Sequence, residues 1–475
     1  LDRRNVSIGR VGENGHYEYK DEDVGNALVG FDGKCIRGLD VSRIPTFLQE
    51  IIKENDVNMI LRHLAFIRDI NNGKGERDVY YHYVYHLFCI YPARIIGVLG
   101  IITREFGSWR DVKGLLEVAE KMKDYQFREV ILNLIKSQLE KDKDADKPSL
   151  LGKYLPGEKA SSTSKWMAKL IAKSLFNGKD KYKNYRKLKS TLTARINLLE
   201  RNLCGNTREN IDCSKIPAGA MKKYRASLSN TDKNGKQKST VQDRVDFALR
   251  WRGYLEGRVA SGRGVSSRGL EIRSVVKMIL DENGDETLIR GFLQDLEGKL
   301  GDLRKVIPVV DTSSSMFGKN GEIYAALGLG VLVSQRTMVP FRDRMITFSA
   351  EPSWFRFDEN DTFEDRVKKA KEAPWGGDTN YYSTGRLIIN ALQNARVPPE
   401  EVSDLIMVVF SDMQFNQSMV QEQKGHSLMT NMQDMFNDAG YDVPTLVFWN
   451  LRGNTGGSPV MANEKNVVQV SGFNQ

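Results

Sequence analysis

Cysteine and histidine are both scarce in this chain of 475 residues. Four cysteines (Cys35, Cys89, Cys204 and Cys213) are too few to brace a protein of this length, and their spacing matches no zinc module. We therefore expect a cytoplasmic protein, or one from another reducing intracellular compartment. The five histidines are scattered, so no Ser–His–Asp triad is evident and we predict no catalytic residues.

Long apolar runs are also missing. The most apolar stretches, near 95–102 and 325–333, are short and interrupted by glycine. A membrane-spanning helix needs about 20 consecutive apolar residues, so we expect a soluble protein with no membrane partner. The hydrophobic fraction of 40% is nevertheless sufficient for packed cores, and the length predicts two or three domains.

The formal net charge of +9 is distributed unevenly along the chain. Residues 1–300 contain 54 basic and 40 acidic side chains, whereas residues 301–475 contain 16 and 21. The excess is greatest in residues 151–250, where 23 basic side chains stand against 8 acidic ones. This asymmetry predicts two parts with different partners, one of them a polyanion.

The part of the chain before residue 301 has a helical pattern. Residues 1–43 are polar and glycine-rich and are expected to form an N-terminal arm. Apolar side chains then recur with helical spacing, which predicts a basic, HEAT-like α-helical array over 44–300 with a mobile loop near 227–240. Individual helices are predicted at about 93–105, 110–123, 125–141, 161–176, 185–203, 241–255 and 270–280.

Residues 301–475 alternate between strand and helix patterns. A β-branched run at 306–310 ends in Asp311, and a helix pattern follows at 322–335. This alternation predicts a doubly wound α/β domain, in which ligands bind beyond the carboxyl ends of the strands. Further strands are predicted at 345–348, 405–410, 445–448 and 467–470.

Three loops of this domain carry small side chains with oxygen atoms. Asp311, Ser313 and Ser315 directly follow the first strand, Thr379 follows a glycine pair, and Asp412 follows the strand at 405–410. Oxygen ligands suit Mg²⁺ or another hard divalent cation. Asp378 competes with Thr379 for its role, and we favour Thr379. Capping of the next helix by the first loop would explain that loop alone.

The order D-x-S-x-S, T and D resembles the metal-ion-dependent adhesion site of von Willebrand factor A domains. The resemblance covers about residues 303–475 and implies that Ser313, Ser315 and Thr379 coordinate the metal. It implies that Asp311 and Asp412 bind the ion directly or through water. It also implies that an acidic side chain of a protein partner completes the coordination.

The helical part resembles Ro/TROVE-like proteins, in which a helical repeat region precedes an A domain. The resemblance rests on the segments Arg68–Asp78, Gly107–Asp111 and Tyr185–Cys204, and it is closest to an uncharacterised sister family of the Ro proteins. Ro proteins bind structured RNAs and single-stranded RNA ends. An RNA partner for residues 44–300 is therefore what the resemblance implies.

Basic and aromatic residues alternate in the segment Lys179–Lys189 (KDKYKNYRKLK). Lysine and arginine neutralise phosphates, and tyrosine rings stack on unpaired bases. The alternative is a solvated helix face with its tyrosines in the core. The candidate RNA-binding residues are Lys179, Lys181, Tyr182, Lys183, Tyr185, Arg186, Lys187, Lys189, Lys222, Lys223 and Arg225.

These patterns predict a non-enzymatic RNA-binding or ribonucleoprotein scaffold. Its helical region would bind RNA, and its Mg²⁺ site would bind an acidic side chain of a partner. The alternative is a metal-dependent protein–protein interaction module without RNA binding. A hydrolytic enzyme is disfavoured because no general base with a histidine-like pKa stands beside the predicted ligands.

Overall fold

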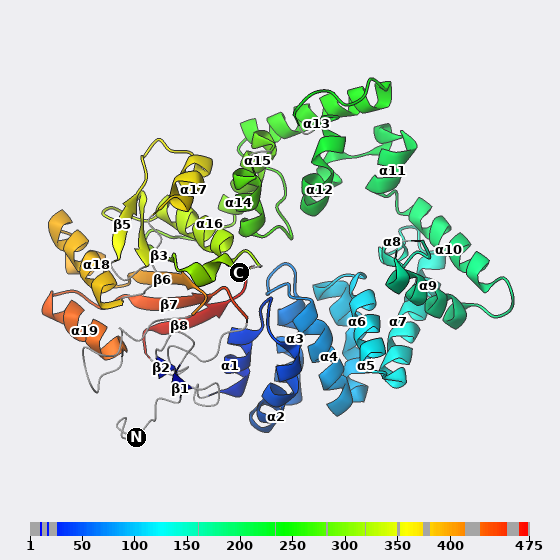
Figure 1. Cartoon of the computed structure of the whole chain (residues 1–475), viewed down its shortest axis with the longest axis horizontal. Helices are drawn as coiled ribbons and strands as arrows, with labels where there is room; N and C mark the ends of the chain where they lie inside the picture. Colours follow the sequence, from blue (N-terminus) through cyan, green and yellow to red (C-terminus); the bar gives the residue numbers. More distant parts are fainter. Residues whose placement is uncertain are drawn as a thin grey trace. The chain divides into compact units, whose positions relative to one another are not determined.

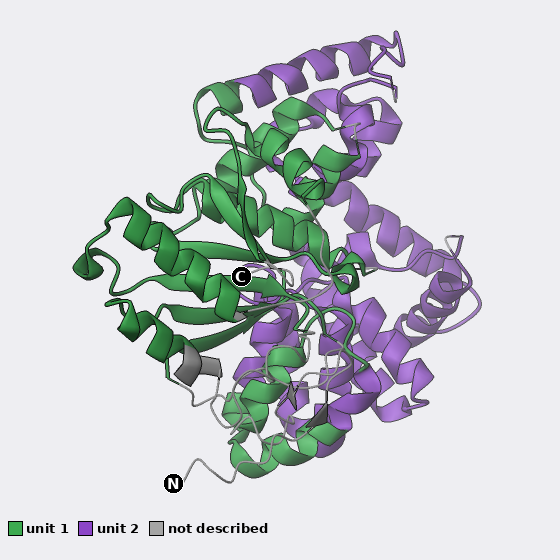
Figure 2. Cartoon of the chain, turned by 60° about the vertical axis from the view of Figure 1, so that its left-hand side comes forward, with its two compact units in different colours: residues 1–40, 46–60, 257–475 green, residues 41–45, 61–256 purple. Residues whose placement is uncertain are grey.

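The computed structural model of this protein (Figure 1) describes residues 26–473 with gaps, and two short strands before them. The gaps fall at 160, 233, 282–283, 319, 349–351, 374–380, 414–427 and 454–464. The chain divides into two compact units (Figure 2). Unit 1 comprises residues 1–40, 46–60 and 257–475, and unit 2 comprises residues 41–45 and 61–256.

Unit 2 is built from helices. In α7, Asp124 caps the first turn by accepting a hydrogen bond from the Phe127 amide, and Phe127, Ile131 and Ile135 lie buried along one face. The helices that lie wholly or partly in this unit are α3 (Val57–Arg68), α4 (Asp78–Ile90), α5 (Pro92–Ile101), α6 (Asp111–Lys121), α7 (Tyr125–Asp144), α8 (Leu151–Tyr154), α9 (Ser162–Leu175), α10 (Lys181–Arg195), α11 (Leu199–Gly205), α12 (Ala218–Leu228) and α13 (Gln242–Ala260). Short helical turns are η3 (Val41–Arg43), η4 (Ile102–Phe106), η5 (Arg208–Asn210) and η6 (Cys213–Lys215).

A buried ion pair joins two of the segments that carry the Ro/TROVE resemblance. Arg68 at the end of α3 donates to both carboxylate oxygens of Asp111 at the start of α6, at 2.8 and 3.0 Å. The Tyr81 hydroxyl donates to the same carboxylate at 3.0 Å. Such a pair is costly to break, so these residues fix α3, α4 and α6 relative to one another.

Unit 1 contains a six-stranded sheet in the order β5-β4-β3-β6-β7-β8. Neighbouring strands are parallel except for β5, which runs antiparallel to β4 at one edge. The predicted α/β architecture is confirmed at this level, although β5 was not predicted. The strands are β3 (Val306–Asp311), β4 (Arg344–Phe348), β5 (Ser353–Arg356), β6 (Ile406–Ser411), β7 (Thr445–Asn450) and β8 (Val467–Ser471).

Helices cover both faces of this sheet (Figure 1). Ile307 and Val309 point to the face that packs against α18 and α19. Val310 points to the opposite face, where a Cβ on Gly330 of α16 would come within 2.5 Å of it. Glycine there lets α16 approach the sheet closely. The helices of this unit are α1 (Ala27–Lys34), most of α2 (Ile44–Glu54), α14 (Ile272–Leu280), α15 (Glu286–Glu297), α16 (Glu322–Ser334), α17 (Phe363–Lys371), α18 (Tyr381–Ala395) and α19 (Leu428–Asp438), with turns η7 (Ser314–Phe317) and η8 (Pro399–Glu401).

Part of the segment expected to be an N-terminal arm packs on this sheet. It forms α1, and the strand pair β1 (Arg10–Val11) and β2 (Tyr17–Glu18) precedes it. Asn450 at the end of β7 donates to the Gly33 carbonyl, and Ser471 at the end of β8 donates to the Asp32 carbonyl, both at 3.0 Å. These bonds tie α1 to the carboxyl ends of two strands.

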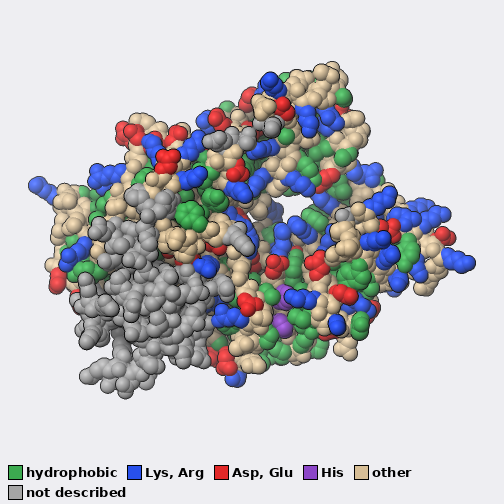
Figure 3. Space-filling view, in the orientation of Figure 1, with side chains coloured by type: hydrophobic (Ala, Val, Ile, Leu, Met, Phe, Trp, Pro, Cys, Tyr) green, Lys and Arg blue, Asp and Glu red, His purple; other side chains and the backbone are tan. Residues whose placement is uncertain are grey.

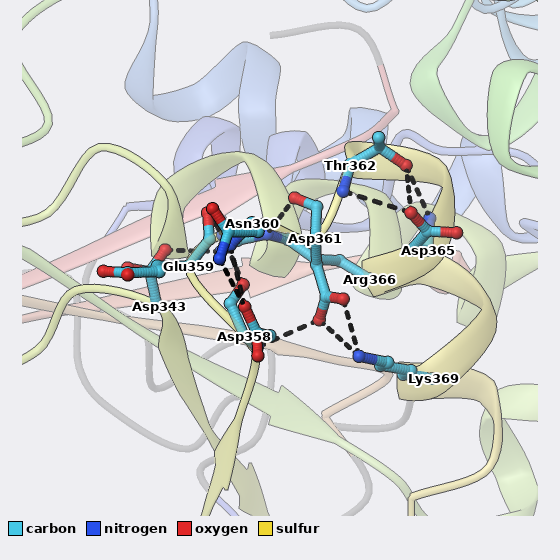
Figure 4. Close-up of polar contacts among 9 residues, drawn as sticks. All are labelled: Asp343, Asp358, Glu359, Asn360, Asp361, Thr362, Asp365, Arg366 and Lys369. Carbon is cyan, nitrogen blue, oxygen red and sulfur yellow. Dashed lines mark hydrogen bonds and ion pairs between the residues drawn. The ribbon is translucent and has the colours of Figure 1, made fainter.

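Arg366 organises the connection between β5 and α17 (Figure 4). Its guanidinium is buried and donates to the Asp343 carboxylate at 2.6 Å and to the backbone carbonyls of Asp358 and Asp361. Thr362 and Asp365 cap the helix reciprocally. The acidic residues of this loop are therefore largely engaged within it.

Among the described residues, no helix is both long and apolar enough to cross a membrane.

Candidate metal centre

Four of the five predicted metal ligands, those that the structure describes, lie at the carboxyl ends of the two central strands β3 and β6. β3 lies between β4 on one side and β6 on the other, and all three strands are parallel. The chain leaves β3 towards β4 through α16 on one face, and α18 covers the opposite face on the way to β6. At such a point the loops after the two central strands diverge and leave a crevice for a ligand.

The loop after β3 gathers three of the predicted ligands. β3 is buried along its whole length, so Asp311, its last residue, is buried at the carboxyl end of the strand. The Ser313 amide donates to Oδ1 of Asp311 at 2.9 Å, and this bond turns the chain back. The hydroxyls of Ser313 and Ser315 then lie 2.9 Å apart. The five-residue segment 311–315 thus brings one carboxylate and two hydroxyls together.

Ser411 connects this loop to the loop after β6. Its hydroxyl donates to Oδ2 of Asp311 at 2.5 Å and accepts from the Met413 amide at 3.0 Å. Met413 has a left-handed backbone with a φ of 62°, so the chain turns sharply at Asp412. Ser411 was not among the predicted ligands. Its place at the end of a buried strand, next to Asp412, was the available signal.

Asp311 and Asp412 form a buried pair of like charges. Both side chains are fully buried. Burial, and secondly the charge of Asp412, raise the pKa of Asp311 well above its usual range. Arg452, two residues beyond β7, donates to Oδ2 of Asp412 at 3.2 Å and remains about one-third exposed. Arg452 was not predicted as part of the site.

The remaining predicted ligand, Thr379, and its competitor Asp378 lie outside the described residues. Within the described ranges, no group of three or more His, Cys, Asp or Glu side chains could hold a metal ion. The candidate centre is not a group of this type, because its donors are two carboxylates and serine hydroxyls. Such a donor set suits a hard cation and does not suit zinc or copper.

The donors present fit a divalent cation by their chemistry. Two buried carboxylates repel one another, and a cation between them would lower the energy of both. The hydroxyls of Ser313 and Ser315 add neutral oxygen ligands beside Asp311. Together with Asp412, these residues offer few negative charges for an ion of charge +2, which keeps its affinity for a further anionic ligand.

The candidate RNA-binding residues lie on α10 and α12 of unit 2, except Lys179, which lies in the turn before α10. Figure 3 shows Lys and Arg side chains gathered over α9 and α10. Lys179, Lys183, Lys187 and Lys223 are exposed, and Lys181, Tyr182, Lys222 and Arg225 are half-buried. Arg186 is exposed but paired with Glu158 at 2.9 Å. Their exposure suits contact with a large polyanion.

Tyr185 and Lys189, two of the candidate RNA-binding residues, donate hydrogen bonds to backbone carbonyls of unit 2. The Tyr185 ring is buried, and its hydroxyl donates to the Pro156 carbonyl at 2.8 Å. Lys189 is half-buried and donates to the Leu155 carbonyl at 2.6 Å. Burial and the charge of Lys113 lower the pKa of Lys189. Tyr185 therefore has the core position that the sequence left open as an alternative.

The candidate centre lies in a region similar to a known protein domain. Residues 305–475 match a family described as a domain of unknown function (DUF7788), and this range spans β3 to β8. The chain is also 28% identical to the uncharacterized protein L728 of Acanthamoeba polyphaga mimivirus. That similarity covers 97% of this chain and 82% of the viral protein. Neither description names an activity.

Proposed function

We propose that residues 301–475 are a von Willebrand factor A-like domain that binds an acidic protein side chain through a divalent cation such as Mg²⁺. The observation that carries the proposal is the convergence of Asp311, Ser313, Ser315 and Asp412 at the junction of β3 and β6. The strand order, with one antiparallel edge strand, is that expected of such a domain.

The four described residues would hold the cation, with Thr379 as the further ligand expected from the sequence. A bound ion supplies a positive charge that attracts a carboxylate. Ser411 keeps Asp311 oriented, since it donates to one oxygen while the Ser313 amide donates to the other. Both carboxylates of the described part of the centre, Asp311 and Asp412, are assigned to the cation and neither is left as a general base, so we propose binding without catalysis.

A peptide display library tests this function directly. Selection on the immobilised protein in Mg²⁺ should enrich peptides that contain Asp or Glu, and EDTA should release them. The double variant Asp311→Ala with Ser313→Ala should retain no peptide while keeping its circular dichroism spectrum. Enrichment of peptides without acidic residues, or retention in EDTA, would contradict the proposal.

We further propose that unit 2 binds RNA through exposed basic residues of α10. Lys183 and Lys187 are both exposed and lie four residues apart, so they occupy the same face of the helix. Half-buried Tyr182 lies beside Lys181, whose ammonium is 5.6 Å from the ring centre. This combination of cations and an accessible ring suits a single-stranded RNA segment. The resemblance of three segments to Ro/TROVE proteins also supports RNA binding by unit 2.

Filter binding of single-stranded RNA at several salt concentrations tests the RNA-binding proposal. Affinity should fall with salt, with a log–log slope of about −0.7 for each phosphate neutralised. Charge reversal at Lys183 and Lys187 should weaken binding and make the slope shallower. Lys368→Glu, an exposed residue of α17, is the matched control. Unaltered binding by the double variant would exclude α10 as the RNA-binding surface, and absence of RNA binding by the unmodified chain would favour the alternative, a metal-dependent interaction module without RNA.

A further inference from the structure

A cavity of about 330 Å³ lies in unit 2, and residues of α11, α12 and α13 line it. The segment near 227–240, which the sequence predicts to be a mobile loop, folds back through a β-bridge between Thr231 and Gln237 and supplies part of the wall. This volume is at the lower end of the range for small-molecule sites. The wall includes the charged residues Glu200, Arg208, Lys238 and Arg244.

Two of the charged residues in the wall have partners of opposite charge. Arg208 is buried and pairs with Asp243 at 2.5 Å, while its second terminal nitrogen donates to the Leu203 carbonyl. Glu200 pairs with Lys153 at 3.1 Å and lies 3.4 Å from the Tyr224 hydroxyl. Both residues are therefore held in place before any ligand binds.

The other two cations of the wall are not matched in this way. Within the described part of the chain, the Arg244 guanidinium has no hydrogen bond or ion pair, and its Nε is buried without a partner. Lys238 is exposed at the rim, and no described carboxylate pairs with its ammonium. With the partners Lys153 and Asp243 included, the site has four cations and two carboxylates. The excess positive charge indicates an anionic ligand.

We propose that this cavity binds a phosphate monoester of nucleotide size, with Arg244 and Lys238 holding the phosphate. An arginine fork and a lysine ammonium suit the phosphate oxygens. Glu200 is an acceptor for a sugar hydroxyl, and Tyr224, Leu203 and Ala226 provide apolar surface for a base. The ligand is either a free mononucleotide or the phosphorylated end of an RNA chain. The site is separate from the metal centre and uses no residue proposed for RNA contact on α10.

Calorimetric titration with adenosine 5′-monophosphate tests the proposal, with adenosine as the ligand that lacks the phosphate. The nucleotide should bind and adenosine should not. Arg244→Ala should weaken binding about tenfold or more, since a charge-assisted hydrogen bond is lost. Lys215→Ala removes the same charge from an exposed residue of unit 2 outside the cavity wall and should bind as the unmodified chain does.

RNA hexamers with and without a 5′-phosphate distinguish the two ligand sources. Measurements in the Lys183→Glu, Lys187→Glu background separate this site from the α10 surface. Tighter binding of the phosphorylated hexamer than of the mononucleotide identifies an RNA end, and the reverse order identifies a free nucleotide. The proposal is overturned if neither ligand binds, if the phosphate makes no difference, or if folded Arg244→Ala retains full affinity.

Discussion

The Ser411 hydroxyl donates a 2.5 Å hydrogen bond to Oδ2 of Asp311, a residue one hundred positions earlier in the chain. This bond joins the loops after β3 and β6 and satisfies a carboxylate that is completely buried. Ser411→Ala should lower the free energy of unfolding by about 1–3 kcal/mol, because one buried carboxylate oxygen loses its donor. Urea unfolding in EDTA measures this change.

Ser314→Ala is the matched control for Ser411→Ala, because Ser314 is exposed in the loop after β3. It should unfold at the same urea concentration as the unmodified chain. Equal stability of both variants would show that the bond between the two loops contributes little.

Arg366 should be the most sensitive residue of the β5–α17 connection. Its guanidinium is buried against Asp343 and several backbone carbonyls (Figure 4), so Arg366→Ala should lower the free energy of unfolding by about 3 kcal/mol. Lys369→Ala breaks a more exposed pair with Asp361 and should cost less than about 1 kcal/mol. Chemical denaturation compares the two, and similar losses would contradict this ranking.

Stability should fall at mildly acidic pH because of His82. Burial, followed by the charges of Lys121 and His86, lowers the pKa of His82 below 6.5. As the pH falls through 6.5, the unfolded chain takes up this proton before the folded chain does, so the free energy of unfolding decreases. His82→Phe keeps an aromatic ring and removes this contribution. Melting temperatures between pH 7 and 5 should therefore decline less steeply in the variant, and parallel curves would exclude the effect.

Arg452 should oppose cation binding. Its guanidinium contacts Asp412 at 3.2 Å and places a positive charge beside a proposed ligand. Arg452→Ala should lower stability in EDTA and increase the affinity for Mg²⁺, whereas Arg452→Lys should change both less. Thermal melting over a Mg²⁺ titration measures both quantities. Weaker Mg²⁺ binding by the alanine variant would mean that Arg452 supports the site.

Much of the sheet could be predicted because its central strands are continuous apolar runs. The predicted strands at 306–310 and 405–410 correspond to β3 and β6, which are buried on both faces. β5 was missed because it is only four residues long, and its outer residues Ser353 and Arg356 are exposed at the sheet edge. A short edge strand is specified by pairing with its neighbour and carries little local signal.

The break between α10 and α11 could not be predicted from the apolar pattern. One helix was predicted over 185–203, but the chain forms α10 and α11 with a break at Asn197, whose φ is 52°. Asparagine tolerates this conformation, yet the apolar spacing continues across it.

The grouping of the candidate ligands was predictable to the extent that it depends on strand ends. The proximity of Asp311, Ser313 and Asp412 could be predicted because neighbouring parallel strands bring their carboxyl ends to the same side of the sheet. Arg452 could not, because its position depends on β7 pairing with β6, and that order is not encoded by any local pattern.

Binding of Mn²⁺, followed by electron paramagnetic resonance, tests the proposed metal centre most directly. The unmodified chain should bind one ion, Mg²⁺ should displace it, and the Asp311→Ala, Ser313→Ala variant should bind none. Asp404→Asn, an exposed residue paired with Lys305, is the control and should bind normally. Equal Mn²⁺ binding by the folded double variant and the unmodified chain would contradict the assignment of the β3–β6 junction as a cation site.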